Sequence, residues 1–411
     1  MSEWKKVKFE ELYAIESRNG LTKPSRIRGN GYKMINMGEL FSNDRIYDIP
    51  MELVPLKDKE KIVAKVEKND LLFARQSLVL EGAGKCSIVM EVSDLTVFES
   101  HLIRVRLNKV KANPMFYYYY FRSPYSSIKT IVSQCAQAGI KGSDLQKLFV
   151  YCPPLEIQHR IATILSRYDS LIENYQKQIK LLEEAAQRLY KEWFVELRFP
   201  GHENTKMVDG LPEGWERKKI NTFVNLQSGY AFKSSTFEEE GIYKIVTIKN
   251  VKDGVFDGEN TSLIRQIPDK MPKHCRLKTG DILLSLTGNV GRICMVVGDD
   301  YLLNQRVAKL ETRYPAFTYC LFRNNDMFIT VNNLANGAAQ QNVSPIRIGE
   351  LKVLFANDSI MNQFENLVGT ICNKIINLYA QIRFLAEARD RLLPRLMGGE
   401  MEVKNNIRER K

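Results

Sequence analysis

The chain has 411 residues, which is enough for two or three domains and for more than one hydrophobic core. Hydrophobic residues make up 44% of it and charged residues 26%, values that are ordinary for a globular protein and exclude extensive disorder. The net charge of +12 favours a polyanionic partner.

Three further classes of protein are disfavoured. No run of about 18 apolar residues could span a membrane. The N-terminal residues lack the apolar stretch of a secretory signal, so we expect a cytoplasmic protein. The seven cysteines include no CxxC pair, which argues against a zinc site or a disulfide framework and favours free thiols.

An internal repeat is the most informative feature of the sequence. Matching segments recur at a slowly falling distance along the chain. They are Trp4 and Trp215 (211 residues apart), 70–73 and 281–284 (211), Gly84-Lys85 and Gly291-Arg292 (207), and 182–189 and 385–392 (203). The falling distance is expected if the second copy lost a few loop residues.

Each copy contains the same two kinds of segment. Residues 1–157 and 213–360 consist of short, apolar, β-rich runs separated by glycine turns, which predicts two mixed modules. Long segments of helical period follow at 158–195 and 361–398. Residues 196–212 form a linker between the copies, and 399–411 form a short basic tail.

Both helical segments carry a heptad stripe, with apolar residues at alternating steps of four and three. The first stripe is Ile161, Leu165, Tyr168, Ile172, Tyr175, Ile179, Leu182, Ala186, Leu189 and Trp193. The second is Phe364, Val368, Ile371, Ile375, Leu378, Ile382, Leu385, Arg389, Leu392 and Leu396, in which Arg389 is the single interruption. Both stripes predict a coiled coil.

The length of the helices favours antiparallel pairing. A stripe of 33 residues extends roughly 50 Å, whereas a module of this size is about 40 Å across. The second module begins near the end of the first helix, so parallel pairing would require that module to bridge the whole rod. We therefore expect one module at each end of an antiparallel pair.

The helices have more apolar surface than one seam requires. The additional residues are Ile164, Leu171, Ala185, Ile376, Phe384, Leu393 and Met397. Two interpretations are open: a partner subunit docks on this surface, or the modules of the chain itself cover it.

The modules carry +6 and +3 of the net charge, so the basic character lies mainly outside the helices. The most basic stretch contains five cations and no acid. It lies between Glu16 and Glu39 and comprises Arg18, Lys23, Arg26, Arg28 and Lys33. Such a loop is suited to contacts with phosphate and, through arginine, to bidentate recognition of guanine.

Other polar loops occupy corresponding places in the two copies. Arg75-Gln76-Ser77 corresponds to Thr287-Gly288-Asn289, and 134–141 to 336–342. Their amides suit adenine. The further DNA-binding candidates are Lys85, Lys141, Lys233, Ser234, Arg292, Gln305, Arg306, Gln340, Gln341 and Asn342. Because these loops differ between copies, two different targets are expected.

No catalytic or metal-binding pattern is present in the sequence. His101, His159, His202 and His274 lack metal-ligand spacing and are assigned as structural or surface residues. Neither a GxxxxGK[ST] loop nor the Asn/Asp-Pro-Pro-aromatic motif of an amino-methyltransferase occurs. The aromatic run 117–121 is interpreted as a packed helix face rather than a base-stacking platform.

Several different short motifs follow one another along the chain. They are Pro153-Pro154-Leu155-Glu156-Ile157-Gln158 with Arg160-Ile161, Arg188-Leu189-Tyr190-Lys191-Glu192-Trp193-Phe194, Phe199-Pro200-Gly201-His202-Glu203, Leu211-Pro212-Glu213-Gly214-Trp215, Ser228-Gly229-Tyr230-Ala231-Phe232-Lys233-Ser234 and Gly280-Asp281-Ile282-Leu283-Leu284. In these motifs the chain resembles the specificity subunit of type I restriction–modification systems. The resemblance covers essentially the whole chain.

The resemblance implies an α+β fold. Two mixed α/β target-recognition domains would be separated by two long helices that form an antiparallel coiled coil, with an internal pseudo-twofold repeat. It implies a non-catalytic subunit that recognises a bipartite DNA target with two different half-sites and a fixed spacer. The expected partners are double-stranded DNA, two methyltransferase (modification) subunits and two restriction (motor/nuclease) subunits. S-adenosylmethionine, ATP and Mg²⁺ are expected on those subunits, and no cofactor on this chain.

Two departures from the family pattern concern the second copy. Asn357-Asp358-Ser359 stands where the first copy has Pro153-Pro154, and Arg389 interrupts the stripe. Docking at that end is therefore expected to be less regular. Two alternative functions are a coiled-coil scaffold, which leaves the basic, loop-variable modules unexplained, and a stand-alone DNA-modifying enzyme, which would need a cofactor motif.

Overall fold

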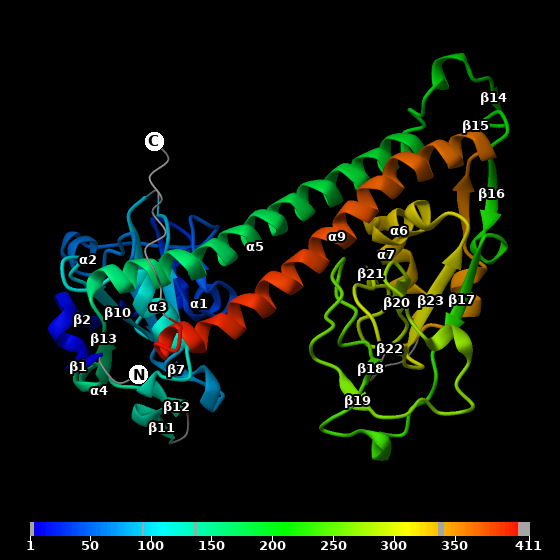
Figure 1. The fold of residues 1–411 in the computed structure, drawn as a ribbon. Helices are drawn as coiled ribbons and strands as arrows, with labels where there is room; N and C mark the ends of the chain where they lie inside the picture. Colours follow the sequence, from blue (N-terminus) through cyan, green and yellow to red (C-terminus); the bar gives the residue numbers. More distant parts are fainter. Residues whose placement is uncertain (1–3, 93, 135–137, 336–340, 402–411) are drawn as a thin grey trace, which may run out of the picture. The chain divides into compact units, whose positions relative to one another are not determined.

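The computed structural model describes residues 4–92, 94–134, 138–335 and 341–401 (Figure 1). The chain divides into two compact units, Met1–Leu171 with Leu385–Lys411, and Ile172–Phe384. We call them unit 1 and unit 2. Two long helices, α5 (Leu155–Tyr190) and α9 (Asp358–Met397), each contribute residues to both units.

Unit 1 is built on a five-stranded sheet. Its strand order is β2 (Tyr13–Asn19), β10 (Leu102–Leu107), β6 (Leu71–Ala74), β8 (Cys86–Val89) and β4 (Arg45–Ile46). All neighbours are antiparallel except β4 and β8. Every residue of β6 and β8 is buried, which explains why these strands are continuous apolar runs rather than alternating ones.

Smaller elements complete unit 1. The sheets are β5 (Glu52–Val54), β3 (Tyr32–Ile35) and β9 (Thr96–Phe98); β1 (Lys5–Lys8) with β13 (Phe149–Cys152); and β11 (Ser133–Gln134), β12 (Ala138–Gly139) and β7 (Gln76–Ser77). The short helices are α1 (Met37–Ser42), α2 (Asp58–Val63), α3 (Pro114–Arg122) and α4 (Gly142–Lys147).

Helix α3 contains the aromatic run. Asn113 caps it by accepting a bond from Phe116 N, and Pro114 occupies its first turn, where a missing N–H costs nothing. The side chains from 117 to 120 are at most 1% exposed. Tyr117 and Tyr119 donate their hydroxyls to the Tyr151 carbonyl (3.1 Å) and to Asp169 of α5 (2.5 Å). The interpretation as a packed helix face is confirmed.

Unit 2 has the same order of strand pairing, and among its described residues no strand corresponds to β4. The main sheet is β17 (Val224–Ser228), β23 (Val307–Thr312), β20 (Ile282–Ser285) and β21 (Ile293–Met295). The others are β19 (Ser262–Ile264), β18 (Tyr243–Val246) and β22 (Tyr301–Leu303); β16 (Glu216–Lys219) with β24 (Lys352–Phe355); and β14 (Met207–Val208) with β15 (Leu211–Pro212). Its short helices are α6 (Pro315–Arg323), α7 (Asn325–Asn333) and α8 (Pro345–Gly349).

Equivalent backbone contacts recur in the two units. Leu21 N donates to the Phe98 carbonyl at 2.8 Å, and Tyr230 N donates to the Leu303 carbonyl at 2.9 Å. The preceding residues, Gly20 and Gly229, are glycines for the same reason. A Cβ at either position would lie within 2.5 Å of backbone atoms of the neighbouring segment.

The heptad stripes lie in the cores of the units. In unit 1, Ile161 and Leu165 of α5 share a core with Leu396 of α9. In unit 2, a core contains Ile179, Ala186 and Tyr190 of α5 together with Phe364, Val368, Ile375 and Leu378 of α9. The Tyr190 and Phe364 rings are 6.5 Å apart. All twenty stripe positions are buried or half-buried.

Arg389, the interruption of the stripe, forms a largely buried ion pair within unit 1. Its Nη1 lies 2.6 Å from Oδ1 of Asp169, whose other oxygen accepts the hydroxyl of Tyr119. The exposed fractions of the Arg389 and Asp169 side chains are 19% and 8%. A carboxylate in such a place needs partners for both oxygens, so the irregular arginine has a structural function.

We predict that replacing Arg389 with leucine destabilises unit 1. The substitution leaves a buried carboxylate with one remaining partner, and losing one half of a buried pair costs about 3–5 kcal/mol. Arg389 retains some exposure, so the lower end is expected, measured as the urea midpoint of unfolding. The double variant Asp169→Asn with Arg389→Leu keeps an acceptor for Tyr119 and should recover most of the loss. Equal stability of Arg389→Leu and the unmodified chain would contradict this account.

Candidate nucleic-acid interface

Two polar segments of unit 2 meet at one end of its main sheet. Strand β20 continues into Leu286 and Thr287, and Thr287 forms a β-bridge with Asn342. The Thr287 hydroxyl donates to Oδ1 of Asn342 at 3.0 Å, and Gly288 N donates to the Gln341 carbonyl at 2.9 Å. The loop after β20 and the segment before α8 therefore lie side by side.

These segments border a hollow of about 470 Å³ in unit 2. Its lining residues are Ser228, Leu286, Thr287, Gln305, Arg306, Asn342, Val343, Ser344 and Pro345. Gln305, Arg306 and Asn342 are exposed. An amide and a guanidinium side by side provide the donors and acceptors that match the edges of adenine and guanine.

The same contacts recur in unit 1 with different side chains. Ile140 N donates to the Arg75 carbonyl at 2.9 Å, as Val343 N does to Leu286. Strand β7 pairs Gln76 with Gly139 of β12. Arg75 N donates to the His101 carbonyl at 2.8 Å. In unit 2, Leu286 N donates to the Arg306 carbonyl at 3.0 Å. His101 thus takes the place that Arg306 has in unit 2.

His101 was missed as a candidate by sequence reasoning, which assigned it as a structural or surface residue. Its ring is exposed, and Nδ1 lies 2.7 Å from Oε1 of Gln76. The repeat contained the signal. His101 and Arg306 are 205 residues apart, between the distance of 207 at Gly84 and 203 at Leu182.

The predicted basic stretch is partly neutralised by carboxylates that are distant in sequence. Lys23 is only 9% exposed, and its Nζ lies 2.8 Å from Glu60. The hydrogen bond from Lys23 lowers the pKa of the Glu60 carboxyl. Because Lys23 is buried in an internal ion pair, its assignment to DNA contact is corrected.

The remaining four cations of this stretch fall into two classes. Arg28 lies 2.6 Å from Glu52 and donates Nε to the Lys23 carbonyl, and Lys33 lies 2.5 Å from Asp48. Arg18 and Arg26 are exposed, and within the described part of the chain no carboxylate pairs with them. These two have the charge best available for phosphate.

Other candidates differ in accessibility. Lys233, Ser234 and Asn289 are exposed, as are Lys141 and Gln341. Arg75 is half-buried, and its Nη1 donates to the Ser100 carbonyl at 3.4 Å. Lys85 is held by Asp44 at 3.1 Å and by the Phe41 carbonyl at 2.8 Å. Arg292 is half-buried, whereas Gln340 lies outside the described residues.

The candidate docking residues on the helices also differ in how exposed they are. Leu393 and Met397 are buried in the core of unit 1, so the module itself covers them, as one of the two open interpretations had it. Leu171 and Phe384 are 44% and 59% exposed. Ile164, Ala185 and Ile376 are half-buried.

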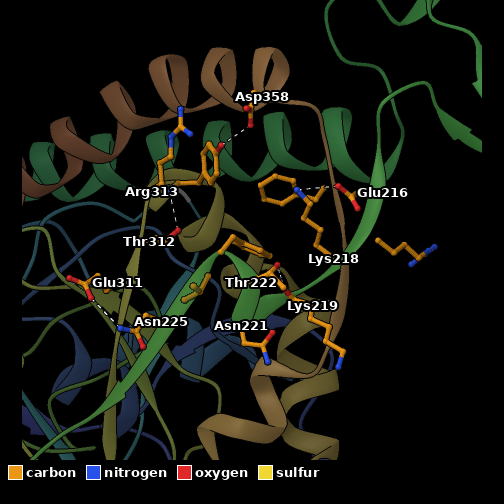
Figure 2. Close-up of a pocket in the computed structure, with 15 residues that line it drawn as sticks. Glu216, Lys218, Lys219, Asn221, Thr222, Asn225, Glu311, Thr312, Arg313 and Asp358 are labelled. Carbon is orange, nitrogen blue, oxygen red and sulfur yellow. Dashed lines mark hydrogen bonds and ion pairs between the residues drawn. The ribbon is translucent and has the colours of Figure 1, made fainter.

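A second, larger hollow of about 810 Å³ lies at the other end of β17 and β23 (Figure 2). It is bordered by charges of both signs, several of which are paired. Lys219 lies 2.5 Å from Glu350, and the Tyr314 hydroxyl donates to Asp358 at 3.0 Å. Its lining has four basic and three acidic side chains, close to balance, whereas a nucleic-acid surface is expected to have a clear excess of cations.

Neither a metal site nor a membrane-spanning helix occurs among the described residues. They contain no group of three His, Cys, Asp or Glu side chains arranged to hold a metal ion. No helix in this part of the chain is long and apolar enough to cross a membrane. The six cysteines described are free thiols, and Cys135 lies outside the described residues.

The match to a known family shows that the chain is a DNA-specificity protein. The sequence profile described as "Type I restriction modification DNA specificity domain" matches residues 1–184 and 212–359. The chain therefore belongs to the family of type I restriction–modification specificity subunits, which are non-catalytic DNA-recognition proteins.

Characterised relatives agree with this assignment. The chain is 28% identical to the MjaIX specificity subunit of Methanocaldococcus jannaschii over 70% of its length and 69% of the relative. It is 27% identical to the MjaVIII specificity subunit of the same organism, over 87% and 84% of the two chains. The crystal structure of a type I S subunit from M. genitalium has a similar fold, with a TM-score of 0.60, 17% identity and coverage of 96% of both chains.

Proposed function

We propose that this chain recognises a bipartite DNA sequence, with one half-site for each unit and an unread spacer between them. The observation that supports this most directly is the repeated polar end of the main sheet. Gln76, His101 and Lys141 line it in unit 1, and Gln305, Arg306 and Asn342 occupy the corresponding region in unit 2. Different donors and acceptors on one scaffold recognise different bases.

The first test compares two arginines that flank one strand. Arg306 immediately precedes β23 at the proposed DNA-facing end, and Arg313 immediately follows β23 at the opposite end. Arg306→Ala should weaken binding by about 1–3 kcal/mol and relax the preference at one base pair of the second half-site. Arg313→Ala removes the same charge and should leave base preference unchanged. Selection of bound sequences from random DNA measures both, and identical effects of the two variants would contradict the proposed orientation.

The second test concerns phosphate contacts. Arg18→Ala and Arg26→Ala should each reduce the slope of log Kobs against log salt concentration by about one, if each neutralises one phosphate. They should not change the base sequence selected. Arg28→Ala is a matched control from the same stretch, since Arg28 already pairs with Glu52. Unchanged slopes in both Arg18→Ala and Arg26→Ala would exclude this stretch from the interface.

We further propose that α5 and α9 form an antiparallel coiled coil and, with the internal pseudo-twofold repeat, set the separation of the half-sites. The helices contain 36 and 40 residues, long enough for about 54–60 Å. This length suits half-sites about one to two turns of DNA apart. The unread spacer would then be a property of the helices.

Lengthening both helices by one heptad tests this proposal. Seven residues inserted at equivalent points of α5 and α9 preserve the apolar seam and add about 10.5 Å. The spacer should grow by about 3 base pairs at ~3.4 Å per pair, with both half-sites retained. Seven residues inserted into the linker at 201–210 serve as the control. A folded insertion variant that still recognises the original spacing would show that the helices do not set it.

The partners are proposed from the same family membership. Two modification subunits and, in the full complex, two restriction subunits would supply catalysis and bind S-adenosylmethionine, ATP and Mg²⁺. The exposed Leu171 and Phe384 are the candidate contacts for the modification subunits. We expect the purified chain alone to bind DNA but to transfer no methyl group from labelled S-adenosylmethionine. Methyl transfer by the isolated chain would overturn this division of labour.

A further inference from the structure

An apolar loop tip projects from unit 1 directly beside the proposed base-contacting residues. Leu78, Val79 and Leu80 follow β7 and are 89%, 59% and 47% exposed. Consecutive large apolar side chains at such exposure mark a binding surface more often than chance. They follow Gln76 by only two to four residues, so the tip and the proposed base contact belong to one connection.

Hydrogen bonds within the loop hold the tip in place. The Ser77 hydroxyl accepts from Val79 N at 3.2 Å, and the Val79 carbonyl accepts from Gly82 N at 3.2 Å. A Cβ at Gly82 would lie 2.2 Å from the Ser77 hydroxyl, so the glycine allows this hydroxyl to approach the turn closely. The base of the loop, from Gly82 to Gly84, is buried. A fixed turn on a buried base presents these side chains with little entropy left to lose on binding.

The tip is also where the two copies differ in length. The distance between matching residues is 211 before this loop and 207 after it, so the connection in unit 1 is four residues longer. In unit 2 the corresponding turn has Asn289 exposed, and its Val290 is 1% exposed. The additional residues therefore give unit 1 an exposed apolar tip that unit 2 lacks.

We propose that Leu78 and Val79 form a wedge that inserts between two base pairs of the half-site bound by unit 1, and that this unstacks and kinks the DNA there. Apolar side chains on DNA-binding proteins act in this way, and flexible pyrimidine–purine steps are the easiest to open. The surroundings favour DNA over a protein partner. Gln76, His101 and Lys141 next to the tip are polar or basic, whereas the core of a protein interface is depleted of such groups.

The proposal rests on the DNA-binding function of unit 1, and the experiment separates the two. The full-length chain is bound to its selected duplex. The half-site of unit 1 is identified as the one whose base preference depends on Gln76, and 2-aminopurine is placed in turn at each of its positions. Fluorescence should rise at one position, where stacking is lost. In the variant Leu78→Ser with Val79→Ser, that rise should disappear and Kd should increase about 10-fold or more. A mismatch at the reporter position lowers the cost of opening, so it should restore much of the affinity.

The matched control is Val110→Ser, which removes an apolar side chain of unit 1 that is 83% exposed and follows β10 at the opposite end of the sheet, and which should leave the signal of the first half-site unchanged. A fluorescence rise that persists in the double variant would overturn the wedge while leaving DNA recognition intact. The wedge would also be overturned if the double variant bound DNA normally but associated more weakly with the modification subunit. The tip would then be a protein contact. Failure of the unmodified chain to bind any selected DNA would instead reject the proposed function together with the wedge.

Discussion

Burial of one apolar stripe on each long helix is the constraint on which the rest of the structure depends. Neither helix can leave this stripe in water, and each unit covers part of it with its own sheet and short helices. In unit 1 the core that contains Ile161 and Leu165 also contains Leu396, and in unit 2 the core that contains Tyr190 also contains Phe364. Each unit thus closes its core with residues from both long helices.

This arrangement separates the residues that fix the fold from those that face solvent at the end of the sheet. Strands β6 and β20 are buried throughout. The residues that follow them differ in type between the two units, but the backbone pairing is the same. The bond from Ile140 to Arg75 has the same length, 2.9 Å, as the bond from Val343 to Leu286. Because main-chain atoms make these bonds, the side chains around them are free to differ while the scaffold stays the same.

The sequence predicted features that depend on local periodicity. The helices at 158–195 and 361–398 begin three residues earlier in the structure, and the first continues through a π-helical turn to Val195. The aromatic helix and the pairing of polar loops also follow from patterns along the chain. These features depend on neighbours in sequence or on the repeat, both of which one sequence contains.

Contacts between distant, unrelated segments could not be predicted. The stretch with Lys23, Arg28 and Lys33 contains no acid, yet Glu60, Glu52 and Asp48 neutralise these cations across 15 to 37 residues. Exposure of Leu78 was equally hidden, because a short apolar run after a strand is consistent with a buried loop as much as with an exposed tip. In both cases the deciding quantity is which side chain covers which, and that is a property of the folded chain.

The ion pair of Arg389 also indicates how the pairing of the helices is specified. Matching residues of the two helices are 203 positions apart, so Arg389 corresponds to Ala186, and Asp169 corresponds to Cys372. Ala186 and Cys372 are both buried in unit 2. An antiparallel pair of two α5 helices in this register would place Asp169 opposite Ala186, and a pair of two α9 helices would place Arg389 opposite Cys372. The first would bury the Asp169 carboxylate without a cation, which costs several kcal/mol. In the second, Arg389 would lose Asp169 and keep its ion pair with Asp390 of its own helix. A polar residue in an apolar seam selects register and partner in this manner, so the interruption of the stripe supports the proposed pairing of α5 with α9 over pairing of two like helices.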